Sequence, residues 1–225
     1  MNLPASKGGQ VRGMTREETY VKLILLDVDD TLYPKGTGPF ALVSERIDEY
    51  VMAWCGIGRE ETEALRKRYV GAYGSTLGGL MKHHGVDPDD YLKKVHDVPV
   101  EDLLRKDERL KSAISGITHD MVVFSNGSVD YVRRVLKSLD VLDFFQDLFT
   151  IEFMDYIPKP RIYPYRKLLE LYGVDPRDCV IVDDRPANIL TAMDMGMKTV
   201  LVGYDAPVPG TVAIPDIYSV AEVVY

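Results

Sequence analysis

The chain is organised as short apolar runs that alternate with amphipathic segments. The first run, residues 21–26, is apolar apart from one lysine and ends directly before three acids, Asp27, Asp29 and Asp30. Near-continuous apolar runs of this length are typical of strands that are buried on both faces in a parallel sheet. Four later runs have the same character and are predicted strands: 121–124, 148–153, 179–182 and 198–202.

Helical periodicity follows three of these later runs. Apolar residues recur at helical spacing within residues 128–139, 163–172 and 186–195. Regular alternation of strand and helix indicates a parallel sheet with helices on both faces. We therefore predict an α/β fold with a Rossmann-like parallel sheet core. The proline-rich tail from Asp205 is predicted to be irregular, apart from a last strand or short helix near residues 218–224.

The segment between the first and second predicted strands is almost entirely helical. A crossover between parallel strands usually contains one helix of roughly a dozen residues, so this segment is too long to be a simple connection. We interpret it as a helical cap inserted after the first strand. Its predicted helices lie within residues 40–54, 60–73, 77–84, 88–95 and 107–115. The predicted division of the chain is a flexible leader (1–18), a core (19–33 and 116–225) and the helical cap (34–115).

Composition and charge narrow the classes of partner. The chain has 225 residues, of which 46% are apolar, which is enough to bury a full core. A net charge of -8 argues against nucleic acid or an anionic membrane surface as the main partner. No apolar run approaches the roughly 20 residues of a membrane span. Cys55 and Cys179 are far apart and are interpreted as reduced thiols, so we expect a cytoplasmic location. No oligomeric state is predicted.

Polar side chains stand at the carboxyl ends of the predicted strands, where open α/β sheets bind their ligands. They are Asp27, Asp29 and Thr31 after the first strand, Ser125 and Asn126 after the second, Lys159 after the third, and Asp183 and Asp184 after the fourth. Asp27 and Asp29 would share one face of an extended segment, roughly 6 to 7 Å apart. Their repulsion, about 2 to 4 kcal/mol, predicts a cation between them. A solvated turn is the alternative, whereas the pattern of a calcium loop does not fit Thr31 and Leu32.

This set of groups suits phosphoryl transfer through a carboxylate. One carboxylate attacks phosphorus, and a second protonates the leaving oxygen and then activates water. Mg²⁺, a lysine, a hydroxyl and backbone amides can offset the charge of the transferred group. Magnesium prefers one or two carboxylates together with waters and phosphate oxygens. The sequence therefore predicts a Mg²⁺ site and a small phosphorylated ligand.

Taken in order, the motifs resemble those of phosphatases of the haloacid dehalogenase superfamily, from residue 23 to residue 202. DVDDT (27–31), SN (125–126), KP (159–160) and DDRPAN (183–188) are similar to the first, second, third and fourth family motifs. The chain departs from the family pattern at Ser125, where threonine is more usual, and at Ile162, where many relatives have a second proline. A dehalogenase activity is disfavoured by Asp29, because the dehalogenase branch differs at that position.

The resemblance implies a role for each matched residue. Asp27 would be the nucleophile and Asp29 the general acid/base, with the backbone carbonyl of Asp29 also on the metal. Lys159 would neutralise charge. Phosphate would be bound by Ser125 and Asn126, and Mg²⁺ by Asp27, Asp29, Asp183 and Asp184.

Two further segments, DVDDTLYPKGTG (27–38) and YGSTLGGLMKHHGV (73–86), look similar to the pyrimidine 5'-nucleotidase subgroup. That resemblance implies a nucleoside monophosphate substrate such as UMP or CMP. Candidate substrate-binding residues are Thr31, Tyr33, Tyr73, Thr76, His83 and His96, and a purely structural role is the alternative for each residue of the cap. Other open functions are a phosphomutase and a phosphatase acting on sugar phosphates or phosphoglycolate. A non-enzymatic binding protein is disfavoured by Asp29, Lys159 and Asp184.

Overall fold

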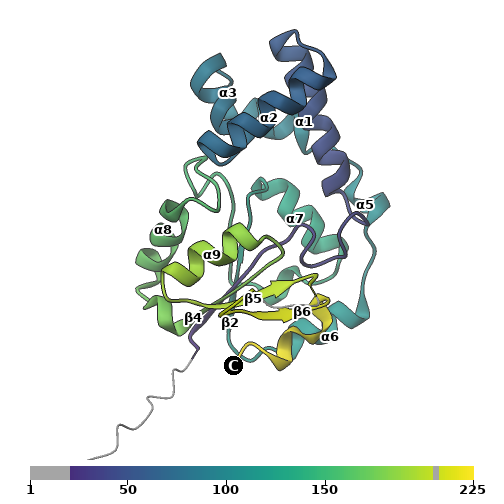
Figure 1. The fold of residues 1–225 in the computed structure, drawn as a ribbon. Coiled ribbons are helices and arrows are strands. Elements are labelled where there is room, and N and C mark those ends of the chain that lie inside the picture. Colours follow the sequence, from purple (N-terminus) through teal and green to yellow (C-terminus); the bar gives the residue numbers. More distant parts are fainter. Residues whose placement is uncertain (1–20, 205–207) are drawn as a thin grey trace, which may run out of the picture.

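The computed structural model describes residues 21–204 and 208–225, and a six-stranded sheet forms the centre of this part of the chain (Figure 1). The strand order is β3-β2-β1-β4-β5-β6, and every neighbouring pair is parallel. The strands are β1 (Leu23–Leu26), β2 (Asp120–Phe124), β3 (Asp147–Phe149), β4 (Cys179–Asp183), β5 (Lys198–Val202) and β6 (Val212–Ile214). The predicted Rossmann-like α/β fold is confirmed. The predicted leader, residues 1–18, lies outside the described residues.

Strand β1 lies in the middle of the sheet and fixes the positions of its neighbours. Leu26 is opposite Val123 of β2 and opposite Val182 of β4. The pairing continues one residue further, because the Asp27 amide donates a 2.9 Å hydrogen bond to the carbonyl of Val182. The polar residues that follow β1, β2 and β4 therefore start at the same level of the sheet.

Successive side chains of β1 point to opposite faces of the sheet, and each face is covered by its own layer of helices. Ile24 and Leu26 belong to the same buried cluster as Val132 of α7 (Val129–Ser138). Leu23 and Leu25 belong to the opposite cluster, which contains buried residues of α8 (Ile162–Tyr172) and α9 (Pro186–Asp194). Because helices cover both faces, every position of the strand must be apolar. The continuous apolar run of the sequence is the result.

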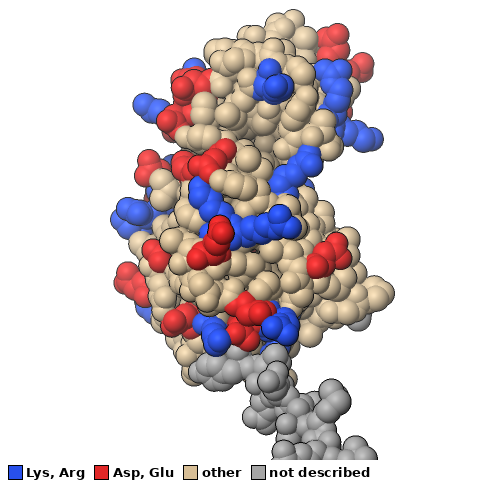
Figure 2. All heavy atoms as spheres, turned by 90° about the vertical axis from the view of Figure 1, so that its left-hand side faces the viewer, with Lys and Arg blue, Asp and Glu red and all other residues tan. Residues whose placement is uncertain are grey.

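Four helices form a group above the carboxyl edge of the sheet, and Figures 1 and 2 show this group as a lobe separate from the core. They are α1 (Phe40–Cys55), α2 (Arg59–Tyr73), α3 (Thr76–His84) and α4 (Pro88–Val95). They pack on one another in the pairs α1–α2, α1–α4, α2–α3 and α3–α4. Among the described residues, none of the helices combines the length and the apolar character that crossing a membrane requires.

The next two helices pack on the core instead. The short α5 (Val100–Leu103), which the periodicity did not predict, lies against α7, and α6 (Glu108–Ser115) lies against the final 3-10 helix η3 (Ile217–Glu222). Leu110 and Ile114 of α6 are fully buried in the cluster that covers one face of the sheet. The predicted end of the cap at residue 115 stays a prediction. The contacts of α5 and α6 with the core favour a boundary between cap and core that lies between α4 and α5.

Two strand predictions differ from the structure. The third strand ends at Phe149 rather than at residue 153, because the chain turns at once and the amide of Met154 bonds to the carbonyl of Thr150. The tail was predicted to be irregular apart from a last strand or short helix near residues 218–224, where η3 lies, but β6 adds a three-residue strand at the edge beside β5. Two short 3-10 helices complete the described elements, η1 (Leu142–Phe144) and η2 (Pro176–Asp178).

Candidate active site

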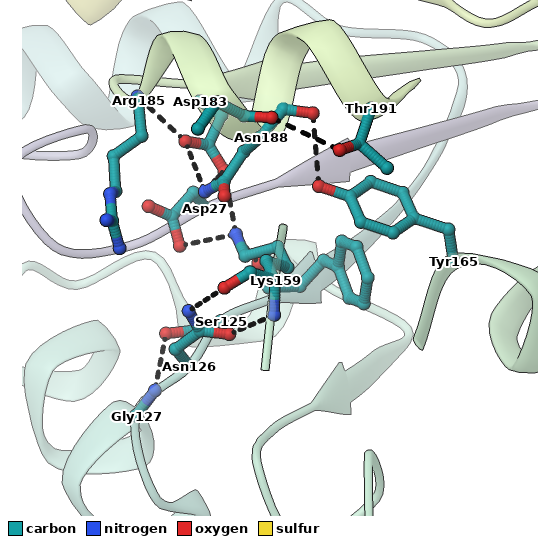
Figure 3. A network of polar contacts seen from close by, with 12 residues as sticks. Asp27, Ser125, Asn126, Gly127, Lys159, Tyr165, Asp183, Arg185, Asn188 and Thr191 are labelled. Carbon is teal, nitrogen blue, oxygen red and sulfur yellow. Dashed lines mark hydrogen bonds and ion pairs between the residues drawn. The ribbon is translucent and has the colours of Figure 1, made fainter. Parts of the chain in front are cut away.

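A buried lysine joins the ends of three neighbouring strands. The Nζ of Lys159 donates hydrogen bonds to Asp27 Oδ1 at 2.9 Å, to Asp183 Oδ2 at 2.8 Å and to the carbonyl of Phe124 at 2.5 Å (Figure 3). The lysine is 1% exposed. Burial alone would lower the pKa of Lys159, but the adjacent carboxylates of Asp183 and Asp27 outweigh burial and raise it. The lysine is therefore a fixed positive charge between two acids.

The backbone of Lys159 is locked to the loop after β2. The amide of Lys159 donates to Asn126 Oδ1 at 2.9 Å, and Asn126 Nδ2 donates to the carbonyl of Lys159 at 3.0 Å. On the other side, Thr191 of α9 donates to the carbonyl of Pro160 at 2.9 Å. These bonds connect the loops after β2 and β3 to α9, so they fix where the ammonium group lies.

Asp183 is held by the first turn of α9. Asn188 Nδ2 lies 2.9 Å from each carboxylate oxygen of Asp183, and the amide of Arg185 donates to Asp183 Oδ1 at 2.9 Å. Together with Lys159, these donors bond to both oxygens of a carboxylate that is 0% exposed. The side chain of Asn188 and the backbone amide of Arg185 are thus the groups of the DDRPAN segment that orient this carboxylate.

Asp27, Asp183 and Asp184 form an acidic cluster. One carboxylate oxygen of each residue lies within 4.8 Å of those of the other two. Burial raises the pKa of Asp184 to about 7, and the nearby Asp183 and Asp30 act in the same direction. Burial also raises the pKa of Asp27 well above its usual range, against the opposing effect of Lys159. Three carboxylates and one ammonium leave an excess of negative charge, and oxygen donors at this spacing fit a hard divalent cation such as Mg²⁺.

The carboxylate of Asp29 lies outside that cluster and is held by two tyrosines. Tyr33 and Tyr131 both donate to Asp29 Oδ1, at 2.5 and 2.7 Å. Burial raises the pKa of Asp29 to about 6, although both hydrogen bonds favour the charged form. Tyr131 was missed by sequence reasoning, since it lies on α7, 102 residues from Asp29. Its only signal was its position in the first turn after the Ser125–Asn126 motif.

The remaining core residues named from the sequence lie around the same point. Ser125 is buried, and its Oγ accepts a 3.1 Å hydrogen bond from the amide of Gly127. Thr31 is also buried, and its hydroxyl has no hydrogen-bond partner among the described residues. Thr31 and Tyr33 line a cavity of about 340 Å³ beside Asp184. Asp30 accepts a hydrogen bond from the amide of Gly36 at 3.4 Å.

A cleft of about 450 Å³ separates the four-helix group from the core. Its floor includes Asp29, Asn126 and Asp184, and its upper wall is formed by residues of α1–α4 and the turn before α3. Two predicted substrate-binding residues, Thr76 and His96, line it. Clefts of this size suit small-molecule ligands.

Tyr73 and His83 are not brought to this cleft. The hydroxyl of Tyr73 lies 2.5 Å from His83 Nε2, and both residues line a separate hollow on the surface of α2 and α3. Tyr33 does not line the cap cleft either, because its hydroxyl bonds to Asp29. Sequence reasoning placed these side chains by motif alone, which does not give the direction in which each points.

Comparison with known proteins identifies the class of protein. The model of the haloacid dehalogenase-like hydrolase family matches residues 21–196, so the chain belongs to this family of hydrolases. Phosphate metabolism protein 8 of Saccharomyces cerevisiae is 24% identical over 197 residues. That alignment covers 80% of this chain but 61% of the yeast protein, so the chain spans about three fifths of its relative.

Solved structures agree with the fold. A HAD phosphatase from Thermococcus onnurineus aligns with a TM-score of 0.60 and 20% identity, over 90% of this chain and 97% of that one. The HAD-hydrolase YfnB from Bacillus subtilis, solved with bound magnesium, aligns with a TM-score of 0.58 and 16% identity, over 91% and 99% of the two chains. The described part of the chain therefore has the fold of these structures.

Proposed function

We propose that the protein is a Mg²⁺-dependent phosphomonoester hydrolase that acts on a small phosphorylated metabolite through an aspartyl-phosphate. The observation that carries the proposal is that four charged side chains meet at the carboxyl edge of the sheet. They are Asp27, Lys159, Asp183 and Asp184. Asp29 follows Asp27 by two residues. This set supplies a nucleophile, a fixed cation, an acidic metal site and a separate carboxyl group. A dehalogenase has no ester oxygen to protonate, so Asp29 favours a phosphatase.

In the first half of the reaction, the carboxylate of Asp27 attacks phosphorus and the bond from phosphorus to the ester oxygen breaks. The departing oxygen takes a proton from Asp29, which gives the free alcohol and leaves the phosphoryl group on Asp27. A pKa of about 6 keeps a useful fraction of Asp29 protonated close to neutral pH.

In the second half, Asp29 takes a proton from a water molecule that attacks the phosphoryl group. The bond from phosphorus to Asp27 breaks, inorganic phosphate leaves, and both aspartates return to their starting forms. Lys159 keeps its charge beside Asp27 throughout and opposes the negative charge that builds up on the phosphoryl oxygens. Mg²⁺ held by Asp27, Asp183 and Asp184 would supply further neutralisation of that charge.

The decisive test is Asp27→Asn, which keeps the shape of the side chain but removes the nucleophile. We expect turnover of p-nitrophenyl phosphate to fall by more than about 10³-fold. Asp155→Asn is the matched control, because Asp155 is an exposed acid of the core that pairs with Lys167 outside the cleft. Substantial activity of pure, folded Asp27→Asn protein would overturn the proposed mechanism.

The substrate is proposed to be a pyrimidine nucleoside 5'-monophosphate. The support is the resemblance of residues 27–38 and 73–86 to that subgroup and the size of the cleft. A panel of UMP, CMP, AMP, phosphoglycolate and sugar phosphates would rank the substrates by kcat/KM. Release of free phosphate from each ester distinguishes a hydrolase from a phosphomutase, which returns the phosphoryl group to a substrate.

We place the enzyme in the cytoplasm. Both cysteines are free thiols, and Cys179 is fully buried in the core. Unpaired cysteines are typical of a reducing compartment.

A further inference from the structure

Arg66 of α2 is a charged residue in an otherwise neutral wall. Among the described residues of α1–α4 that line the cleft, it is the only one with a formal charge. The others are apolar or carry a neutral hydroxyl. They are Phe40, Val43, Ser44, Ile47, Val70, Thr76, Leu77, Tyr91, Leu92 and Val95.

The guanidinium of Arg66 is already engaged by α1. Its Nη1 donates to Asp48 Oδ1 at 2.6 Å and to the carbonyl of Ser44 at 3.1 Å, and its Nη2 donates to Ser44 Oγ at 3.2 Å. A guanidinium has five N–H donors, so these three bonds leave two available. The side chains of Arg66 and Asp48 are only 23% and 16% exposed, which limits screening of the pair by water.

Pairing with Asp48 changes which ligand groups Arg66 can select. An unpaired arginine in a partly buried cleft attracts phosphates and carboxylates strongly. Arg66 and Asp48 together carry no net charge, so Asp48, which accepts a hydrogen bond from the guanidinium at 2.6 Å, cancels most of the attraction of Arg66 for a second anion on the ligand. The two remaining N–H groups of Arg66 can still donate to a neutral carbonyl oxygen, whose binding does not depend on a net positive charge.

We propose that Arg66 binds a neutral carbonyl oxygen on the leaving group of the substrate, and that Asp48 makes the cleft reject leaving groups with a second negative charge. The inference rests on the proposed phosphatase function and deepens it. The favoured substrate is the phosphate monoester of an alcohol that has a planar or apolar body, to match the wall, and an amide-like carbonyl at the far end. Arg66 and Asp48 are then specificity-determining residues.

Three aryl phosphates with the same body test this inference: phenyl phosphate, 4-carbamoylphenyl phosphate with a neutral carbonyl, and 4-carboxyphenyl phosphate with an anion. Arg66→Lys keeps the charge but loses the planar fork. We expect it to lower kcat/KM for the carbamoyl ester by about tenfold, the effect of one charge-assisted hydrogen bond, mainly through KM. The phenyl ester should change by less than about twofold.

Asp48→Asn tests the proposed role of Asp48 in rejecting a second negative charge, because it leaves the charge of Arg66 unpaired. We expect kcat/KM for the carboxy ester to rise by about fivefold or more relative to the phenyl ester. Arg68→Lys is the matched control, because Arg68 lies on the same helix but lines the separate hollow with Tyr73. Its kcat/KM values for the three esters should equal those of the wild type.

The outcomes separate this inference from the proposed function. If the wild-type protein hydrolyses none of the three esters, the phosphatase proposal fails. If it hydrolyses phenyl phosphate but the folded Arg66 and Asp48 variants change all three esters alike, the pair is only a brace between α1 and α2, and the inference is overturned. Thermal unfolding of each variant establishes that it is folded.

Discussion

At the scale of single residues, the two tyrosines on Asp29 decide where its proton lies. Both phenols donate to Oδ1, so Oδ2 is the oxygen that remains for the acidic proton. In the proposed mechanism such positioning matters, because the proton must reach the ester oxygen at the moment that the bond to phosphorus breaks. Tyr33 and Tyr131 are positioning residues, since they act through Asp29.

Removal of one phenolic hydroxyl should therefore affect substrates according to their leaving group. We expect Tyr131→Phe to lower kcat/KM by about tenfold for an alkyl phosphate, the effect of one hydrogen bond to a charged group. For p-nitrophenyl phosphate, whose leaving group needs no proton, kcat/KM should stay within about twofold. Tyr163→Phe is the control, because Tyr163 bonds to Asp155 on the surface. Equal losses for both esters would contradict the assigned role.

His96 makes stability depend on pH. Burial lowers the pKa of His96 to about 4, and its ring stacks on Tyr131 with 4.5 Å between the centroids. The unfolded chain takes up this proton near pH 6.5, but the folded chain does so only near pH 4. Above pH 6.5, His96 is neutral in both states and does not lower the free energy of unfolding. As pH falls from 6.5 toward 4, only the unfolded chain binds the proton, so the free energy of unfolding decreases.

His96→Phe should remove that dependence while it keeps a ring against Tyr131. From pH 7.5 to 5.0, we expect the free energy of unfolding of the wild type to fall by about 2 kcal/mol more than that of the variant. Urea unfolding at both pH values measures the difference. Parallel pH dependence of the two proteins would show that His96 takes up its proton in the folded state.

The motif residues of the site were predictable because their spacing follows the strands. Asp27, Ser125, Lys159 and Asp183 each follow a predicted strand, and parallel pairing brings such ends together. Tyr131 and Arg66 follow no such rule. Their roles depend on which way a helix turns a side chain toward a partner distant in sequence, and that direction comes from tertiary packing.

At the scale of elements, α2 and α3 pack so closely that one contact position must be glycine. A Cβ at Gly79 of α3 would lie 2.1 Å from Cγ of Tyr69 on α2. Gly71 of α2 is the opposite case, since a Cβ there would meet nothing within 4 Å. The two helical glycines thus have different reasons to be present.

Gly79→Ala should destabilise the protein by about 1 to 3 kcal/mol, because overpacking outweighs the gain in helix propensity. Gly71→Ala should stabilise it by about 0.5 to 1 kcal/mol, since alanine restricts the unfolded chain at no steric cost. Chemical denaturation of the two variants beside the wild type measures both values. A stabilised Gly79→Ala variant would mean that α2 and α3 do not pack as described.

Elements were predictable where one local signal was strong. The buried strands stood out as apolar runs and the cap helices by their periodicity. Strand β6 did not stand out, because its apolar run, Val212–Ile214, is only three residues long. Helix α5 has four residues, too few to establish a period.

At the scale of the whole molecule, negative charge is concentrated at the candidate active site and does not form one continuous acidic surface on the face in Figure 2. The chain carries a net charge of -8, yet Figure 2 shows acidic and basic side chains interspersed over the face it presents. The cluster of Asp27, Asp183 and Asp184 is thus a local feature, which Lys159 only partly balances. A cation that binds there should stabilise the folded protein.

Mg²⁺ at about 100 times its dissociation constant should raise the free energy of unfolding by about 2.7 kcal/mol. For a chain of this size, that corresponds to an increase in Tm of roughly 5 to 10 °C. EDTA should reverse the shift, and Asp184→Asn should largely abolish it. Differential scanning fluorimetry measures the shift without any substrate. No change in Tm over millimolar Mg²⁺ would contradict a metal site at this cluster.

Helices α1–α4 form one continuous segment after the loop that follows β1, whereas Asp27, Asp29, Lys159 and the acidic cluster stand at the ends of the core strands or on the loops that follow them. Evolution can consequently treat α1–α4 as an exchangeable module. Under the proposed function, substitutions in those helices would change which esters fit the cleft and leave the catalytic groups of the core unchanged.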